Sequence, residues 1–395
     1  MSVIRGSLVA GLILLAGCSG NNNDTAGPAG WRSQPPGTVV EVQEAGATSR
    51  VEGAEQSLLV RYTTINVQGQ PALASGIVLL PAALKAGQVR PLVVYGHMTT
   101  GAADACAPSR GTPESTELRR MQQGDEIARR LLARGVVVAR PDYEGLGEDG
   151  PHPYLRGDSL AQSMRDMASA VAGHWNGIGD RWVAAGHSEG GVAALNTANS
   201  QHPEARGLRL VGVAAITPVT QLSKLVSLLE PVPIAGPGID TTVALAGLAI
   251  SGVASVDPVF KRLILEEGGL SPRALELWPD LERLCLEDLS QKDSWGGLAP
   301  QQVKGPRGDE ALAMLQRALD EDDVRLIPMR QDVPIRIDAG IIDLVALLPF
   351  TEQLASEYRR QELSVTYQRW PTGHSPTADM AAPAIVNWIM QRFES

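Results

Sequence analysis

A serine lies between two glycines in residues 186–190, which read Gly-His-Ser-Glu-Gly and match the pattern G-x-S-x-G. An apolar run suited to a strand, residues 182–185, precedes the pattern, and residues 192–196 suit a helix. In this context a sharp turn lifts the serine hydroxyl above a sheet, and glycines are needed because a Cβ would meet neighbouring backbone. The sequence therefore predicts Ser188 as a nucleophile, against the alternative of a glycine-rich turn without chemistry.

A nucleophilic serine needs a base. The chain has six histidines, and His374 follows the last predicted strand, residues 364–370, at the edge where such sheets present catalytic groups. His187 lies inside the turn and cannot reach round to Ser188 productively. The remaining four show no partner pattern: His97, His152, His174 and His202. We predict His374 as the base, against the alternative of a surface-loop histidine.

The base in turn needs an acid that orients it. Asp343 follows the predicted strand at residues 335–339, and the interval to His374 holds one helix (350–361) and one strand (364–370). This spacing places both side chains at the carboxyl edge of adjacent strands. Asp343 is the predicted acid, while Asp338, within the strand, and Asp323 remain alternatives.

Acyl transfer develops a negative oxygen that needs two N–H donors, one of them from the residue after the nucleophile. That residue is Glu189. The second donor is expected in the loop at residues 96–101, after the strand at 92–95, from Met98 or Thr99. Because backbone donors are specified by geometry more than by side chain, a loop that only links a strand to a helix remains the alternative.

The elements that position these residues alternate between strand and helix, which is typical of an α/β fold with a largely parallel sheet. Residues 62–66 and 72–80 predict an opening antiparallel pair, and Gly135 stands where a helix should end. Later predicted strands are residues 92–95, 136–139, 182–185, 208–216, 333–337 and 364–370, and predicted helices lie around residues 127–132, 160–171, 350–361 and 385–389.

Residues 218–332 break the alternation, because they show helical periodicity and few strand signals. Strands resume afterwards, as if one sheet were being completed, so we predict a helical cap inserted into a sheet domain formed by residues 38–217 and 333–395. A separate C-terminal half-domain is the alternative.

The N-terminus predicts a secretory signal, because Arg5 is the only charge in the first 23 residues and the apolar run from Leu8 to Ala16 is too short to span a membrane. The following Leu15-Ala16-Gly17-Cys18 resembles the lipobox of bacterial lipoproteins. That resemblance implies removal of residues 1–17, lipidation of Cys18 and, with Ser19 in the next position, delivery to the outer membrane. An ordinary signal peptide is the alternative. Residues 18–37 predict a flexible tether.

Composition excludes several classes of protein. The 395 residues carry a formal charge of −10, with 44% hydrophobic and 20% charged residues, which is typical of a globular protein and not of a phosphate-binding surface. Nucleic-acid binding is therefore not expected. No metal site is predicted either: Cys106 and Cys285 form no CxxC motif, and Asp142 and Glu144 offer too few oxygens for a calcium cage. The loop with these carboxylates is expected to support the wall of the active site.

Residues from about 62 to 374 resemble the secretory (fungal-type) lipase family of α/β-hydrolases. The resemblance implies an α/β-hydrolase fold with a helical lid, a catalytic triad of Ser188, Asp343 and His374, and a disulfide between Cys106 and Cys285. Two departures stand out: Met98 replaces the first glycine of the family's His-Gly-Thr-Thr-Gly pattern, and the turn around Asp343 is apolar. The motifs that carry the resemblance are residues 96–101, 106–109, 140–147, 152–154 and 186–191.

The expected function is a serine carboxylic-ester hydrolase that needs no cofactor and acts on acyl esters or lipids. The same triad would serve an amidase or an acyltransferase, because leaving-group preference depends on the pocket. A non-catalytic lipoprotein that binds lipid in the cap is the alternative from another class. The sequence leaves the oligomeric state open.

Overall fold

The computed structural model describes residues 28, 30–82 and 88–394. The predicted signal peptide (1–17), the lipidation site Cys18 and the first part of the predicted tether lie outside these residues, so they stay predictions. Within the part that is described, no helix is both long and apolar enough to span a membrane.

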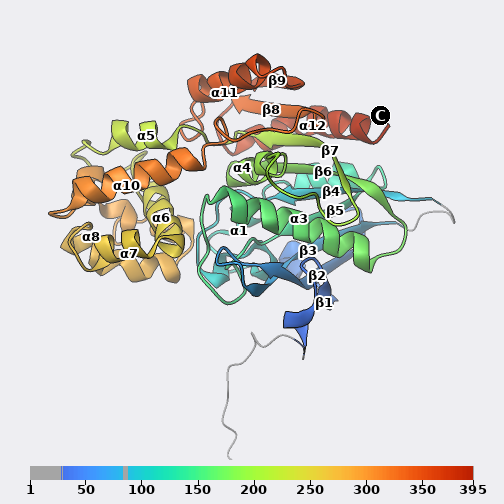
Figure 1. Cartoon of the computed structure of the whole chain (residues 1–395), viewed down its shortest axis with the longest axis horizontal. Helices are drawn as coiled ribbons and strands as arrows, with labels where there is room; N and C mark the ends of the chain where they lie inside the picture. Colours follow the sequence, from blue (N-terminus) through green and yellow to red (C-terminus); the bar gives the residue numbers. More distant parts are fainter. Residues whose placement is uncertain (1–27, 29, 83–87, 395) are drawn as a thin grey trace, which may run out of the picture.

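The described residues form a nine-stranded sheet in the order β1-β2-β3-β5-β4-β6-β7-β8-β9 (Figure 1). The first strands pair antiparallel, as predicted for residues 62–66 and 72–80, and the strands from β5 through β9 pair parallel. This confirms the predicted α/β class. The strands are β1 (Val39–Glu44), β2 (Ala54–Ile65), β3 (Pro71–Pro81), β4 (Arg90–Gly96), β5 (Val137–Pro141), β6 (Ile178–His187), β7 (Arg209–Ile216), β8 (Ile335–Gly340) and β9 (Val365–Trp370).

Helices cover both faces of the sheet, so its central strands are apolar on both sides. In β6, Trp182 and Ala184 belong to the core beneath α3 (Gly157–His174) and α4 (Glu189–Asn196). Val183 and Ala185 point the other way, into the core beneath the second pair of helices. That pair is α2 (Asp125–Leu132) and α12 (Pro376–Glu394); α11 (Leu348–Arg360) precedes β9, and the short α1 (Leu118–Met121) precedes α2.

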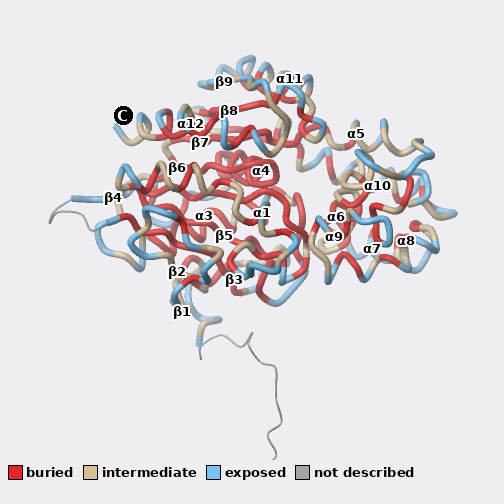
Figure 2. The backbone as a smooth tube through the Cα atoms, turned by 180° about the vertical axis from the view of Figure 1, so that it is seen from behind, coloured by how far each residue is buried: buried red, intermediate tan, exposed pale blue. Residues whose placement is uncertain are grey.

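Six helices lie between β7 and β8, and they form a separate lobe at one end of the sheet, which we call the cap (Figure 1). The lobe contains buried residues of its own (Figure 2). Trp295 is fully buried there, its Nε1–H donates to Leu277 O at 2.9 Å, and a Cβ at Gly247 would lie 2.7 Å from its ring. The cap helices are α5 (Leu222–Leu229), α6 (Asp240–Val256), α7 (Pro258–Leu265), α8 (Pro272–Leu277), α9 (Leu286–Leu289) and α10 (Gly308–Glu321).

Regular structure begins closer to the N-terminus than the Pro/Gly-rich composition of residues 18–37 indicates. Residues Trp31–Ser33 form a 3-10 turn inside the predicted tether, and the Gly37 N–H donates to Thr63 O at 2.7 Å. Gly37 also lies so close to α3 that a Cβ would be 2.5 Å from Ser169 Cβ. The last part of the predicted tether is therefore attached to the domain, because backbone contacts with distant elements order a segment that has no hydrophobic periodicity.

Candidate active site

Ser188 lies in a strained turn between β6 and α4, with φ 57° and ψ −116°. Its N–H donates to Ile216 O on β7 at 2.8 Å. The glycines on either side are required: a Cβ at Gly186 would lie 2.1 Å from Gly190 O, and one at Gly190 would lie 2.0 Å from Gly96 O. Backbone strain of this kind persists only where the surroundings over-determine the turn. The local pattern thus forces the serine out of the sheet.

His374 lies between Ser188 and Asp343. Its Nε2 is 2.8 Å from Ser188 Oγ, and its Nδ1 is 2.8 Å from Asp343 Oδ2. Because a carboxylate only accepts, the proton on the imidazole belongs to Nδ1, and Nε2 is free to accept the serine proton. The second oxygen of Asp343 accepts the N–H groups of Val345 and Ala346, both at 2.8 Å, so the carboxylate cannot rotate away.

The two other acids considered from the sequence serve the scaffold. Asp338 accepts two hydrogen bonds from Arg336, both at 2.7 Å, and one from Trp370 Nε1 at 2.8 Å. Burial raises the pKa of Asp338, and Arg336 offsets part of that effect. Asp323 accepts from the Thr220 hydroxyl and the Gln221 N–H. Of the three acids, Asp343 is the one bound to the imidazole of His374.

His187 packs against His374. Its Nε2 is 3.2 Å from His374 O, and the two rings lie 5.1 Å apart. Burial holds the pKa of His187 well below its usual value, and the neighbouring His374 lowers it further. The ring is therefore neutral, donates to the carbonyl oxygen and supports the loop that carries His374.

The loop with the expected second oxyanion donor is held by side chains. His97 Nδ1 donates to Met98 O at 2.7 Å, and Tyr143 OH donates to His97 O at 3.0 Å. Thr99 Oγ1 is 2.8 Å from Tyr154 OH. Met98 and Thr99 line the same cavity as Ser188 and His374, so both stay candidates for the donor.

The carboxylates of the loop at residues 140–147 accept hydrogen bonds from other parts of the fold. Asp142 accepts from Ser75 Oγ at 2.7 Å and from the Ser109 N–H at 3.0 Å, and burial raises its pKa. Glu144 accepts from the Val67 N–H at 3.0 Å and from a serine hydroxyl of α3. Among the described residues no cluster of three or more His, Cys, Asp or Glu side chains could hold a metal ion.

Sequence reasoning missed a partner of His152. Its Nε2 lies 3.0 Å from Glu189 Oε1, and both side chains are almost completely buried. Tyr143 packs between His97 and His152, with ring distances of 4.4 and 6.1 Å. The local signal was only that residues 152–154 and 186–191 both belong to family motifs; nothing in either motif pairs His152, in a loop, with Glu189, at the start of α4.

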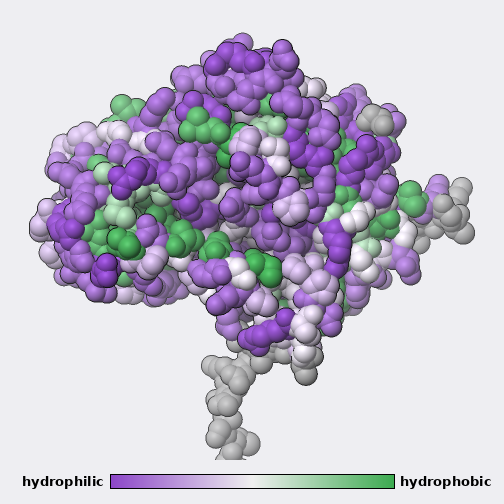
Figure 3. Space-filling view, viewed as in Figure 1, coloured by the Kyte–Doolittle hydropathy of each residue, from purple (hydrophilic) through white to green (hydrophobic). Residues whose placement is uncertain are grey.

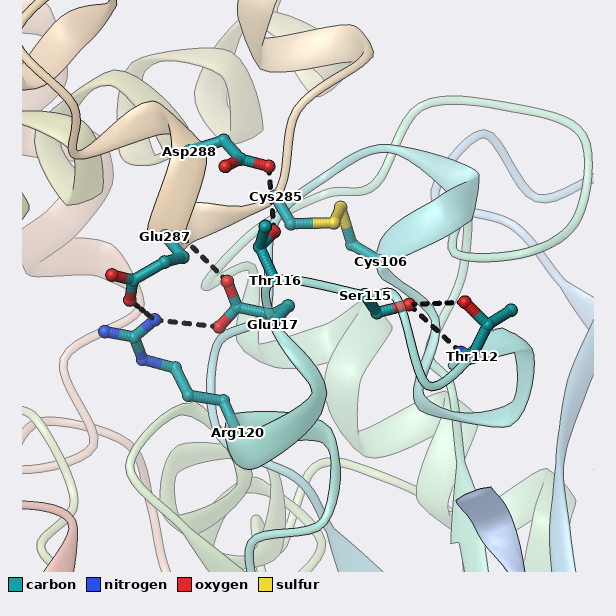
Figure 4. The surroundings of a disulfide bond; sticks show 9 residues. All are labelled: Cys106, Thr112, Ser115, Thr116, Glu117, Arg120, Cys285, Glu287 and Asp288. Carbon is teal, nitrogen blue, oxygen red and sulfur yellow. Dashed lines mark hydrogen bonds and ion pairs between the residues drawn. A yellow bond between two sulfur atoms is a disulfide. The ribbon is translucent and has the colours of Figure 1, made fainter. Parts of the chain in front are cut away.

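The cap is tied to the loop at residues 96–101. The predicted disulfide between Cys106 and Cys285 is present, with a Cα–Cα distance of 5.4 Å (Figure 4). Beside it, the Leu286 N–H donates to Thr100 O at 2.8 Å. Arg120 joins Glu117 of the core to Glu287 of the cap, at 3.0 and 2.9 Å. Core and cap are thus fastened next to the candidate oxyanion loop.

We expect a variant with Cys106→Ser and Cys285→Ser to lose about 2–5 kcal/mol of unfolding free energy, because the bridge closes a long loop in the unfolded chain. Urea unfolding measures the loss. A reducing agent should lower the stability of the wild type and leave that of the variant unchanged. Equal midpoints for oxidised wild type and variant would contradict the prediction.

A cavity of about 570 Å³ extends from the candidate site into the cap. Ser188 and His374 lie on its wall, and most of the remaining wall is aliphatic. Figure 3 shows apolar side chains gathered on the surface of the cap as well. The aliphatic residues come chiefly from α5, α6 and α10, among them Leu222, Leu225, Val226, Leu229, Leu245, Ala249, Leu312 and Leu315.

Comparison with known proteins places the chain in a class. Candida antarctica lipase A, solved in its closed state, superposes with a TM-score of 0.75 at 17% identity, over 94% of this chain and 85% of the other. The rice cell wall degrading esterase LipA of Xanthomonas oryzae gives a TM-score of 0.67 at 21% identity, over 92% and 98%. These similarities show an α/β-hydrolase fold, the class in which a serine at a strand–helix turn is met by Asp and His from later strands.

The family follows from the sequence comparison. The secretory lipase family matches residues 114–395, which is more than half of the chain. The chain therefore belongs to the secretory lipase family, as the motifs predicted. A Mycobacterium tuberculosis protein named a probable inactive lipase is 26% identical over 380 residues, which cover 93% of this chain and 80% of that protein.

Proposed function

We propose that this protein is a serine carboxylic-ester hydrolase that cleaves esters of long acyl chains. One observation carries the proposal: His374 is within 2.8 Å of both Ser188 Oγ and Asp343 Oδ2, at the wall of an aliphatic cavity. The word inactive in the name of the mycobacterial relative applies to that protein. Here the three polar groups that ester hydrolysis needs are in contact.

The reaction follows from the positions of these groups. Ser188 Oγ attacks the acyl carbon while His374 Nε2 takes its proton, and Asp343 stabilises the imidazolium. The oxyanion is stabilised by the Glu189 N–H and a donor from Met98 or Thr99. His374 then gives its proton to the leaving alcohol, which leaves an acyl-enzyme. Water, deprotonated by His374, attacks the acyl-enzyme, releases the acid and restores Ser188.

The cavity supports a long acyl chain as substrate. Burying one methylene contributes about 0.8 kcal/mol, so an aliphatic wall favours longer chains. Leu228 and Leu344 line the cavity and are 65% and 82% exposed. Ile341 and Ile342, beside Asp343, are also exposed. The apolar turn at Asp343 therefore forms part of an apolar entrance, which suits a substrate presented by a lipid surface.

The first experiment uses soluble protein that lacks residues 1–18, assayed on p-nitrophenyl esters from acetate to palmitate. We expect hydrolysis, with kcat/KM rising with chain length, and covalent labelling of one serine by a fluorophosphonate. A folded protein that is neither active nor labelled would favour the second candidate, a non-catalytic lipid-binding protein, which the aliphatic cavity and the name of the mycobacterial relative support. Activity on amides alone would indicate an amidase.

We expect Ala249→Trp to narrow the cavity and change the chain-length preference. Ala249 lies on α6 in the cavity wall, remote in sequence from the catalytic groups. Burial of about four methylenes would be lost, which is enough to lower kcat/KM for the palmitate ester about a hundredfold or more. The acetate ester serves as the internal control and should be hydrolysed at the wild-type rate. Equal losses of kcat/KM on both esters would show that the acyl chain does not bind beside Ala249.

We also propose that Cys18 anchors the protein to a bacterial outer membrane through its lipid. The resemblance of residues 15–18 to a lipobox supports this. Incorporation of labelled palmitate by the full chain, lost in Cys18→Ala, tests the proposal, and a secreted, unlabelled wild type would overturn it.

A further inference from the structure

A carboxylate lies beside the place where the reaction develops negative charge. Glu189 immediately follows the nucleophile, and its N–H is the expected oxyanion donor. Its side chain is 1% exposed and lies in the protein interior, so water does not screen its charge. An anionic side chain on that residue would repel the oxyanion that its own N–H stabilises.

Hydrogen-bond geometry determines the charge of the pair that Glu189 forms with His152. The Nδ1 of His152 is 2.8 Å from the carbonyl oxygen of Glu144. A carbonyl oxygen only accepts, so Nδ1 carries a hydrogen. The other nitrogen, Nε2, is 3.0 Å from Glu189 Oε1, and this contact needs one proton. The proton makes either an imidazolium with a carboxylate or an imidazole with a carboxylic acid. In both forms the net charge of the pair is zero.

The groups packed around the pair do not supply the compensation. Tyr143 stacks on His152 with rings 6.1 Å apart and 10° between planes, and the ring of Tyr154, tilted by 59°, also lies 6.1 Å from that of His152. Burial, and next the charge of Glu189, raise the pKa of both tyrosines, so they stay neutral. Burial lowers the pKa of the nearby His97 despite the opposing effect of Glu189. His152 is therefore the group that shares the compensating proton with Glu189.

We propose that His152 is a positioning residue that holds Glu189 in a pair of zero net charge, which allows the Glu189 N–H to stabilise the oxyanion. The inference rests on the proposed ester hydrolysis. It gives a buried histidine outside the triad a task in catalysis, and it explains how a glutamate is tolerated directly after the nucleophile. The benefit lies in the transition state, because the ground-state ester carries no charge at that oxygen.

Three variants test the proposal: His152→Gln, Glu189→Gln and the double variant. Glutamine at position 152 keeps a donor for Glu189 but carries no charge, so we expect kcat to fall about ten- to a hundredfold with KM nearly unchanged. Glutamine at position 189 carries no charge and can donate to the neutral imidazole, so Glu189→Gln is the reference against which the double variant is compared. The double variant should return to the level of Glu189→Gln, since no charge is left to compensate.

The double variant separates charge compensation from packing. If His152 only fills space, the double variant will be as slow as His152→Gln, and the proposal is wrong. The proposal also fails if Glu189→Gln alone abolishes activity. Should His152→Gln not fold, the comparison of the double variant with Glu189→Gln still decides. A wild type that hydrolyses no ester contradicts the proposed function instead, which keeps the two failures distinct.

Discussion

Replacing Ser188 by alanine should lower kcat/KM for p-nitrophenyl esters by at least about 10⁴-fold, because loss of the nucleophile removes the acyl-enzyme route altogether. The variant should also lose covalent labelling by a fluorophosphonate. Its stability should match or exceed that of the wild type, since Ser188 is held at a positive φ of 57° by the turn and not by its hydroxyl.

The matched control is Ser200→Ala, which changes an exposed serine that follows α4 on the same stretch of chain. We expect wild-type rates and full labelling from this control. Residual ester cleavage in Ser188→Ala within tenfold of the wild type would show that another group performs the chemistry. That result would remove the basis for assigning His374 and Asp343 their roles.

Replacing Asp343 by asparagine should lower kcat by about 10⁴-fold while leaving KM nearly unchanged. The carboxylate accepts Nδ1–H of His374 at 2.8 Å and the N–H groups of Val345 and Ala346. An amide nitrogen facing the ring would instead donate to Nδ1. The ring proton would then lie on Nε2, and Nε2 could no longer accept the proton of Ser188. Steady-state kinetics on the acetate and palmitate esters measure the effect.

Asp338→Asn supplies the control, because it changes the rival acid, whose hydrogen-bond partners Arg336 and Trp370 belong to the scaffold. It breaks a buried ion pair with Arg336, so we expect a loss of about 3–5 kcal/mol in unfolding free energy. The folded fraction should keep the wild-type kcat. If Asp338→Asn abolished kcat in folded protein and Asp343→Asn did not, the assignment of the acid would be reversed.

The cap is attached to the core beside the loop at residues 96–101. Cys285 at the base of the cap is joined to Cys106, and the Leu286 N–H binds Thr100 O. These two bonds hold the cap against the loop that carries Met98 and Thr99, and both of these residues line the aliphatic cavity. In the proposed reaction, the cap cavity that takes the acyl chain and the loop that supplies an oxyanion donor are therefore held by the same contacts.

Local patterns were sufficient for much of the fold. Short apolar runs predicted the later strands, and the glycines of residues 186–190 predicted the turn. Both signals are local: a strand buried on both faces is apolar throughout, and the glycines are required by close contacts with neighbouring backbone. The strand β1 and the ordered residues 30–37 were missed, since partial exposure and Pro/Gly-rich composition hide strands and turns that depend on β2 and α3. Chain order and strand spacing also brought Ser188, Asp343 and His374 into consideration as a set.

Tertiary structure alone decided between acids and revealed partners. Asp338 and Asp343 are both near the carboxyl end of β8, and only side-chain directions show that Arg336 occupies one and His374 the other. The pairing of His152 with Glu189 joins a loop to the first residue of α4, and no periodicity encodes it. The sequence by itself determined which chemical groups are available, because the turn at Ser188 and the order of the strands follow from local patterns. Only the tertiary structure decided which charged groups are paired, because these pairs form between distant segments. Burial makes an unpaired charged group costly, so the packing of those segments decides the pairs.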